Sequence, residues 1–295
     1  MAAVNAAVSR STRPGSPAEP IKLPTIADIT GKGSGLPNRL ILHAVEGWGK
    51  TSFGAQFKNA IFIEVGKETG LETLIDNGLV SDTSHFPAVQ SWEELLGAIA
   101  ALTNDPHPYK VAVIDTINGA ETMCHEFVCQ RDFGGDWGER GFASYGKGTE
   151  VSLPEWRNLL NALDKLREVR KMGILLLCHT RVKKFNNPAG ADYDRYQPDM
   201  NEKTWGLTHK WSDAVFFGNF EVTVDQGSKV DLTKKGKGVG GNHRVMYTQR
   251  DAAFDAKNRL GLPVEIDMGD SAADGWANFV KELRTAKPAA EKEAA

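Results

Sequence analysis

Within residues 39–51, a glycine-rich turn lies between an apolar run and the start of a predicted helix. The run RLILH has the continuous apolar character of a strand that is buried on both faces. The turn AVEGWGKT follows it directly, and the helical pattern KTSFGAQF begins near Lys50. This order matches the phosphate-loop pattern G-x-x-x-x-G-K-[ST], except that Ala44 replaces the first glycine. The pattern predicts an α/β fold with a phosphate-binding turn at the end of a strand.

The residue types in this turn suit a triphosphate. Gly47 and Gly49 allow backbone N–H groups to turn toward phosphate oxygens without interference from a Cβ. Lys50 reaches the β- and γ-phosphates, and the Thr51 hydroxyl is a ligand for Mg²⁺. The residues predicted to cradle ATP are Ala44, Val45, Glu46, Gly47, Trp48, Gly49, Lys50, Thr51 and Ser52.

Two further apolar runs end in polar residues that we expect at the same edge of the sheet. The run VAVID ends in Asp115, which either holds Mg²⁺ through water or caps the following helix. The run GILLLC leads into His179, whose ring either senses the γ-phosphate or satisfies a backbone carbonyl.

The carboxylate that would orient the attacking water is left open by the sequence. Glu64 ends the run AIFIE, Glu68 follows in GKETG, and Glu46 lies inside the turn. Each of them is equally compatible with an ordinary exposed carboxylate.

Strands and helices alternate through the rest of the chain. Apolar runs predict strands at 39–43, 60–65, 111–115, 173–178 and 214–220, and antiparallel strands follow residue 220. Capping boxes at Ser91 and Ser152 predict two helix starts, and a last helix is expected at 276–283. The predicted fold is a mostly parallel sheet flanked by helices, with an antiparallel C-terminal extension. Residues 1–37 are expected to be a flexible tail and lead-in, 38–284 the core, and 285–295 a disordered tail.

Composition excludes several classes of protein. The chain has 295 residues, with 35 Lys+Arg against 38 Asp+Glu, so it does not coat nucleic acid by bulk charge. No apolar run approaches the roughly 20 residues that span a bilayer, which argues against a membrane partner. The first 20 residues lack the apolar stretch of a secretory signal, and three cysteines cannot form a disulfide framework. We expect a cytoplasmic protein.

The combination of EGWGKTSFGAQF, AIFIE, VAVIDT, SYGKG, ILLLCHTRVKKF and FDAKNRLGLP resembles the phage nucleotide-binding ATPases with a RecA-like core, an AAA-type P-loop domain. Among these it is similar to the phage single-strand annealing proteins of the fourth Sak group, relatives of the RecA and RadA recombinases. The resemblance covers residues 38–284. It implies an ATP- and Mg²⁺-dependent protein that handles single-stranded DNA in the bacterial cytoplasm, often with a single-strand-binding protein.

The resemblance also assigns roles to single residues. Lys50 and Asp115 would belong to the catalytic site, and His179 would occupy the switch position. Lys257 and Arg259 would reach the γ-phosphate of a neighbouring subunit, which makes a homo-oligomer part of the mechanism. The glutamate that relatives place after the strand AIFIE is missing in register here, where Gly66 stands, so Glu64 or Glu68 would replace it. A hexameric helicase-like motor or loader, or a nucleotide switch that binds no DNA, are the alternatives.

Two segments predicted as long loops carry cations and aromatic side chains, at 131–150 and at 181–203. This composition suits a single strand whose phosphates are neutralised and whose bases stack. The other interpretation is that the aromatic side chains anchor the loops to the core. The candidate DNA contacts are Tyr145, Lys147, Arg181, Lys183, Lys184, Phe185, Tyr193, Arg195 and Tyr196.

Overall fold

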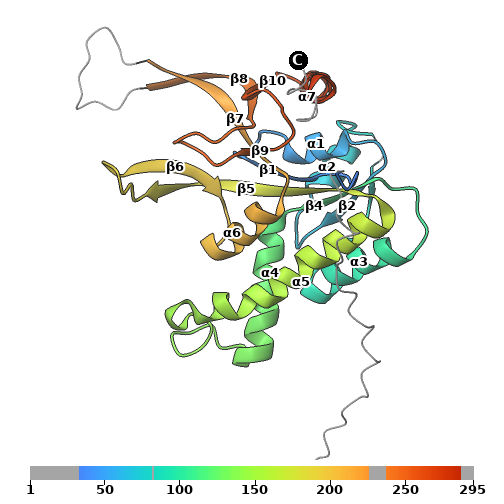
Figure 1. Ribbon diagram of the computed structural model, residues 1–295, viewed down its shortest axis with the longest axis vertical. Coiled ribbons are helices and arrows are strands. Elements are labelled where there is room, and N and C mark those ends of the chain that lie inside the picture. The colour runs from blue at the N-terminus through green and yellow to red at the C-terminus, as the bar shows by residue number, and fades with distance from the viewer. Residues whose placement is uncertain (1–32, 82, 226–236, 287–295) are drawn as a thin grey trace, which may run out of the picture. The chain divides into compact units, whose positions relative to one another are not determined.

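A computed structural model describes residues 33–81, 83–225 and 237–286, and the elements below belong to the unit Leu36–Ala295. The strands are β1 (Arg39–Ala44), β2 (Ala60–Glu64), β3 (Ser84–His85), β4 (Val111–Asp115), β5 (Gly173–Phe185), β6 (Tyr193–Pro198), β7 (Ala214–Asp225), β8 (Lys237–Tyr247), β9 (Lys257–Asn258) and β10 (Glu265–Gly269) (Figure 1). The helices are α1 (Lys50–Ala55), α2 (Gly70–Asp76), α3 (Trp92–Asn104), α4 (Ile117–Phe133), α5 (Lys147–Arg170), α6 (Glu202–Trp211) and α7 (Ala272–Thr285). The predicted tails lie outside the described residues, apart from residues 33–37, 285 and 286.

The strands form one mixed sheet in the order β10-β8-β7-β1-β5-β4-β2-β3, with β6 paired to β5 and β9 to β7. The six strands from β7 to β3 in this order are parallel, whereas β8 and β10 are antiparallel additions beyond β7. The predicted fold class is therefore confirmed, including the antiparallel extension. Because β1, β4 and β5 are parallel neighbours in this sheet, their carboxyl ends meet at one edge.

Alternate residues of the central strands enter two separate cores. Ile41 and Ile63 pack into the core that α3, α4 and α5 cover. Leu42 and Phe62 pack into the core that includes Phe53 of α1. Figure 1 shows the two groups of helices on opposite faces of the sheet. This two-sided burial explains why the strands read as continuous apolar runs.

Two of the predicted helix boundaries differ from the structure. Ser91 caps α3 as predicted, and its Oγ accepts a hydrogen bond from the Glu94 N–H at 3.2 Å. Ser152 does not cap a helix, because α5 already begins at Lys147, and the Ser152 hydroxyl instead donates to the Gly148 carbonyl at 2.8 Å. The last helix, α7, is longer than predicted because Ser271 caps it four residues earlier than expected, with Oγ accepting from the Asp274 N–H.

No helix in the described part of the chain is long and apolar enough to cross a membrane.

His43, the residue before Ala44 in β1, is fully buried and hydrogen-bonded as a neutral imidazole. Its Nε2 lies 2.8 Å from the Asp255 carbonyl oxygen, and its Nδ1 lies 3.0 Å from the Thr180 hydroxyl. A carbonyl only accepts, so Nε2 carries the proton and donates, while Nδ1 accepts from Thr180. Burial lowers the pKa of His43 to about 4.

This histidine makes folding stability depend on pH. An unfolded histidine, with a pKa of about 6.5, takes up a proton that the folded one does not. We expect the free energy of unfolding to fall by about 2–3 kcal/mol from this group as the pH falls from about 7 to about 4.5. Urea unfolding at the two pH values measures the effect. His43→Gln should remove this part of the pH dependence, whereas His85→Gln, at a side chain that is 32% exposed, should retain it. An unchanged pH dependence in His43→Gln contradicts the assignment.

Candidate functional site

The turn between β1 and α1 has the backbone that a phosphate cradle requires. Gly47 has φ 73° and Gly49 has φ 97°, both in the left-handed region that favours glycine. Ala44, at the place of the pattern's first glycine, is fully buried at the end of β1. The methyl group of Ala44 packs closely against Gly218 of β7, since a Cβ built at Gly218 would lie 2.8 Å from the Ala44 Cβ.

Lys50 directly follows this turn as the first residue of α1. The residue is 8% exposed, and its ammonium group donates to the Ala44 carbonyl at 3.3 Å. Burial lowers the pKa of Lys50, while the nearby carboxylates of Asp115, Glu46 and Glu68 act against that shift. The buried ammonium is therefore held next to the turn with a single neutral acceptor among the described residues.

Thr51 and Asp115 meet although 64 residues separate them. The Thr51 hydroxyl donates to the Asp115 carboxylate at 2.7 Å, and Asp115 is buried at the carboxyl end of β4. Burial raises the pKa of Asp115, and the hydrogen bond from Thr51 opposes the shift. A hydroxyl beside a carboxylate is an oxygen donor set of the kind that Mg²⁺ prefers, so these two residues fit the metal. The alternative role for Asp115, as the cap of the following helix, is wrong. Thr116 caps α4 instead, with its Oγ1 accepting from the Gly119 N–H at 3.3 Å.

The structure separates the three candidate glutamates. Glu68 Oε1 lies 3.5 Å from His179 Nε2, and its carboxylate interacts electrostatically with both Lys50 and Asp115. Glu46 is exposed on the turn. Glu68 is therefore the candidate that the fold brings together with the phosphate loop, Asp115 and His179.

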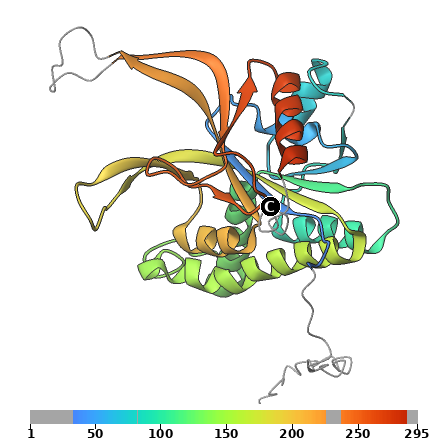
Figure 2. The same cartoon turned by 45° about the horizontal axis from the view of Figure 1, so that its top comes forward.

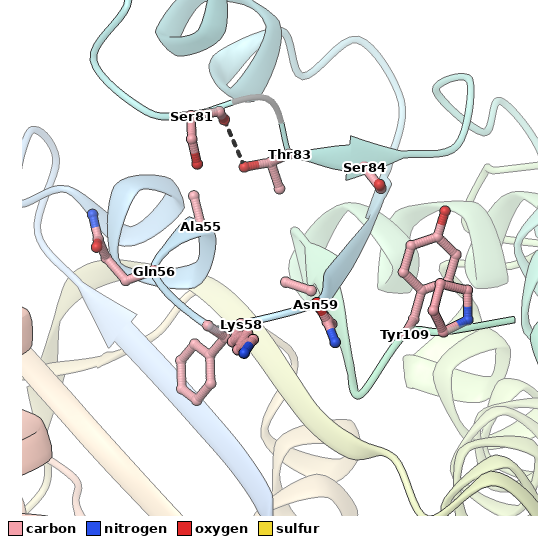
Figure 3. A pocket seen from close by; sticks show the side chains of 11 residues that line it. Ala55, Gln56, Lys58, Asn59, Ser81, Thr83, Ser84 and Tyr109 are labelled. Carbon is pink, nitrogen blue, oxygen red and sulfur yellow. Dashed lines mark hydrogen bonds between the residues drawn. The ribbon is translucent and has the colours of Figure 1, made fainter.

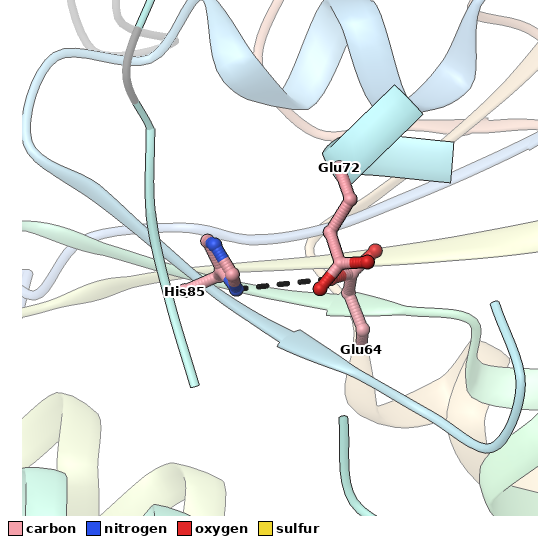
Figure 4. A group of neighbouring side chains, drawn as sticks. All are labelled: Glu64, Glu72 and His85. Atoms are coloured by element: carbon pink, nitrogen blue, oxygen red, sulfur yellow. Dashed lines mark ion pairs between the residues drawn. The ribbon is translucent and has the colours of Figure 1, made fainter. Parts of the chain in front are cut away.

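Glu64 is directed elsewhere. It is 1% exposed, and its Oε1 accepts from the Leu71 N–H at 3.3 Å, while Oε2 lies 3.9 Å from His85 Nδ1. Figure 4 shows Glu64 with Glu72 and His85, and the potential ligand atoms of the three all lie within 4.8 Å of one another. Burial raises the pKa of Glu64. This group of side chains has donors that a transition metal can use, but Glu72 and His85 are exposed.

His179 is joined to neighbouring elements through its backbone. Its N–H donates to Asn118 Oδ1 at 3.1 Å, and its carbonyl accepts from Asp199 N–H at 2.8 Å. The ring faces Glu68, and the described residues include no backbone carbonyl that is hydrogen-bonded to it. Of the two interpretations of His179, this geometry favours a ring that senses the γ-phosphate over a ring that satisfies a backbone carbonyl.

The first predicted DNA segment, 131–150, is mostly helix and tight turns rather than a long loop. Residues up to Phe133 continue α4, and α5 begins at Lys147, whose ammonium lies 5.9 Å from the Phe133 ring centroid. Phe142 is 7% exposed and packs in a small core with Val128 and Cys129, so the anchoring interpretation applies to it. Tyr145, at 107% relative exposure, points into solvent.

The second predicted loop, 181–203, is wrong as a loop, because β5 and β6 form an antiparallel hairpin with Phe185 opposite Tyr193. The cations and aromatic residues alternate with the period of two that is typical of a strand, and this pattern was interpreted as a loop. The cations on its surface are paired with acids: Arg181 with Asp199, Lys183 with Glu202, and Lys184 with Asp192.

Arg195 and Tyr196 of this hairpin face inward. Arg195 is 6% exposed and donates to the Asp255 carboxylate at 2.5 Å, and the Tyr196 ring packs against Phe217 with centroids 5.1 Å apart. These two residues anchor the hairpin. Among the candidate DNA contacts, only the residues that are exposed are therefore accessible to a DNA strand.

The two predicted trans-acting cations have different environments. The Lys257 ammonium donates to the carbonyls of His209 and Ser212 at 2.6 and 2.5 Å, so it stabilises the carboxyl end of α6. Arg259 is exposed, and no hydrogen bond or ion pair joins its side chain to another described residue. Of the two, Arg259 is the one whose side chain is exposed to solvent.

A pocket of about 390 Å³ lies at the end of the sheet opposite to the phosphate loop (Figure 3). Asn59 and Ala60, at the start of β2, and Tyr109, before β4, line it. Ligands of open α/β sheets bind at the carboxyl ends of the strands. The pocket is at the amino ends and is thus separate from the phosphate loop.

Sequence reasoning missed Arg244. Its guanidinium donates to the Trp48 carbonyl at 3.3 Å, across 196 positions of sequence. Nothing in the spacing of β8 indicates this contact, because only the pairing of β8 with β7 brings it to the turn.

Comparison with known proteins identifies a family. No curated protein matches this sequence. Among solved structures, the chain is similar to one described as the crystal structure of the RadB recombinase, with 11% sequence identity and a TM-score of 0.42 over 80% of this chain and 89% of that one. A family model described as an AAA domain matches residues 36–260, which include the phosphate loop, Asp115 and His179. The chain belongs to the AAA domain family.

Proposed function

We propose that this protein binds and hydrolyses ATP with Mg²⁺ and binds single-stranded DNA, as an annealing or recombination protein that works as a homo-oligomer. The observation that carries the nucleotide site is the convergence of Lys50, Thr51 and Asp115 at the carboxyl ends of β1 and β4. The phage setting, the host cytoplasm and a single-strand-binding protein as partner are proposed from the sequence resemblance.

The residues of the site divide the work between binding and hydrolysis. The N–H groups of the turn at Gly47 and Gly49 would cradle phosphate oxygens, and the buried Lys50 ammonium would neutralise their charge. Thr51 and Asp115 would hold Mg²⁺, directly and through water, and the ion would neutralise charge that develops on the phosphates. Glu68 would accept a hydrogen bond from the attacking water and so orient it.

Arg259 supports the proposal that ATP lies between subunits. It is an exposed cation, and a neighbouring subunit's γ-phosphate is the ligand that we propose for it. His179, between Glu68 and the start of the β5–β6 hairpin, would transmit the state of the phosphate to the hairpin.

The DNA-binding part of the proposal is supported by one exposed and two partly exposed aromatic residues and by surface ion pairs. Tyr145 projects into solvent, and Tyr193 and Phe185 form an aromatic pair near the tip of the hairpin with centroids 5.3 Å apart. The pairs of Lys183 and Lys184 lie at the surface, where such bridges contribute at most about 1 kcal/mol. Phosphates can therefore displace the acidic partners at small cost.

ATP turnover measured with and without single-stranded DNA tests the function. We expect the DNA to stimulate turnover of the wild-type protein. The double variant Tyr145→Ala with Tyr193→Ala should lose about 30-fold in DNA affinity, since each stacked base contributes at least about 1 kcal/mol. Its ATP affinity should stay unchanged, and Tyr109→Ala, at the amino ends of the strands, serves as the control.

Other results would favour other functions. Turnover that is indifferent to single-stranded DNA, together with no DNA binding, would point to a nucleotide switch. Directional unwinding of a forked duplex would point to a helicase-like motor. Strand annealing without unwinding is the expected outcome.

A further inference from the structure

Trp48 is an unusual residue for an exposed turn because it is almost completely buried. It lies between Gly47 and Gly49 and is 1% exposed. Its indole Nε1–H donates to the Asn219 carbonyl at 3.1 Å and lies 3.3 Å from the Val245 carbonyl. These two acceptors belong to β7 and β8 and are opposite each other in the antiparallel register. One side chain of the phosphate loop therefore contacts both strands of what we call the β7–β8 arm (Ala214–Asp225 with Lys237–Tyr247).

The arm provides a fitted place for this ring. Gly218 of β7 faces Trp48, and a Cβ built at Gly218 would lie 2.6 Å from Cε2 of the indole, which no relaxed structure tolerates. The adjacent Val45 N–H donates to the Gly218 carbonyl at 3.1 Å. A glycine is needed at this position because of the close approach of the ring.

Arg244 of β8 holds the turn from the other side. Its Nη1 donates to the Trp48 carbonyl at 3.3 Å, and its Nε and Nη2 donate to the carbonyls of Gly269 and Met268 at 3.2 and 3.4 Å. The same Nη1 would lie 3.2 Å from a Cβ at Gly49, so the guanidinium contacts the loop where the proposed phosphate cradle turns into α1. The backbone of the loop is thus joined to the arm by a hydrogen bond at Trp48, and the guanidinium lies close to Gly49.

The arm extends away from the helices together with the β5–β6 hairpin. Figures 1 and 2 both show the two hairpins projecting from the same end of the sheet, to the left in each view. A shift of the loop at Trp48 would therefore displace β7 and β8 directly, because the indole is hydrogen-bonded to both strands.

We propose that Trp48 is a positioning residue that couples nucleotide binding to the β7–β8 arm, with Gly218 and Arg244 completing the contact. The inference rests on the proposed nucleotide site. A seated Trp48 holds the loop in its binding conformation, and a nucleotide that stabilises this conformation stabilises the arm in return. Because coupling free energies are reciprocal, loss of the contact weakens nucleotide binding and disconnects the arm from it.

Hydrogen exchange of the arm with and without a non-hydrolysable ATP analogue and Mg²⁺ tests this coupling. In the wild-type protein the analogue should slow exchange at residues 218–220 and 245–247. Trp48→Phe keeps an aromatic ring but removes the indole donor, so we expect analogue affinity to fall about tenfold. In this variant the analogue should still protect the turn and α1 while its protection of the arm is lost.

Matched variants separate coupling from general damage. Trp137→Phe changes a tryptophan that is 50% exposed and should behave as wild type. Arg244→Gln is the second test variant, at a partly exposed residue, and should also lose protection of the arm. Persistence of arm protection in folded Trp48→Phe or Arg244→Gln overturns the inference.

The wild-type protein distinguishes the two levels of failure. If it binds the analogue but the exchange of the arm does not change, the coupling fails and the proposed function stands. If calorimetry detects no binding of the analogue, the proposed nucleotide site fails, and the coupling that rests on it fails as well.

Discussion

Lys50→Ala is expected to reduce the affinity for MgATP by at least about 100-fold while the protein remains folded. The side chain donates its hydrogen bond to a neutral carbonyl, so its charge is available to phosphate oxygens. Two charge-assisted hydrogen bonds to phosphate at about 1.5–3 kcal/mol each account for a loss of this size. Isothermal titration calorimetry with MgATP measures the affinity, and thermal unfolding confirms that the variant is folded.

Lys58→Ala is the control for this experiment. Lys58 is exposed between α1 and β2, at the other end of the helix, so its removal changes the net charge equally without touching the turn. We expect its affinity to match that of the wild-type protein. Wild-type affinity in Lys50→Ala would instead mean that the triphosphate binds somewhere other than at residues 44–52.

Glu68→Gln is expected to lower the rate constant of ATP hydrolysis by about 100-fold or more, with little change in nucleotide affinity. Glutamine has nearly the same shape but cannot take the proton from the attacking water or attract it by charge. Glu68 already faces His179 and interacts with Lys50 and Asp115, so the reacting water would lie within its reach. Steady-state turnover at saturating ATP, with binding measured separately, distinguishes hydrolysis from affinity.

The same substitution at the other two candidates provides the comparison. Glu64→Gln retains an oxygen that can accept from the Leu71 N–H, and it should leave turnover close to that of the wild-type protein. Glu46→Gln, on the exposed part of the turn, should do the same. A large loss of turnover in Glu64→Gln combined with a normal rate in Glu68→Gln would reverse the assignment.

Much of the candidate site was predictable because its information is local. Gly47, Gly49, Lys50 and Thr51 lie within five residues, and their spacing follows from the geometry of a single strand–turn–helix unit. The Ser91 cap is equally local, since its partner is three residues away. The position of Asp115 needed only one further step, the rule that parallel strands bring their carboxyl ends to one edge.

Two predictions were wrong where a residue pattern was compatible with more than one local structure. Ser152 has the pattern of a capping box, but it lies inside α5, which already begins at Lys147. Cations spaced along residues 181–198 resemble a solvated loop, yet pairing with β6 makes them a hairpin, and the partner Asp255 buries Arg195.

The sequence by itself determined the class of fold and the residue pattern of the turn between β1 and α1, because both depend on apolar runs and on residue types at short, fixed spacing. Only the tertiary structure decided which glutamate meets Lys50 and Asp115, which cations remain exposed, and where Trp48 is held. Hydrogen bonds join Thr51 to Asp115 and Trp48 to Val245, for example, across 64 and 197 positions of sequence. Many alternative partners at such separations satisfy the same local pattern, and the packed sheet selects among them.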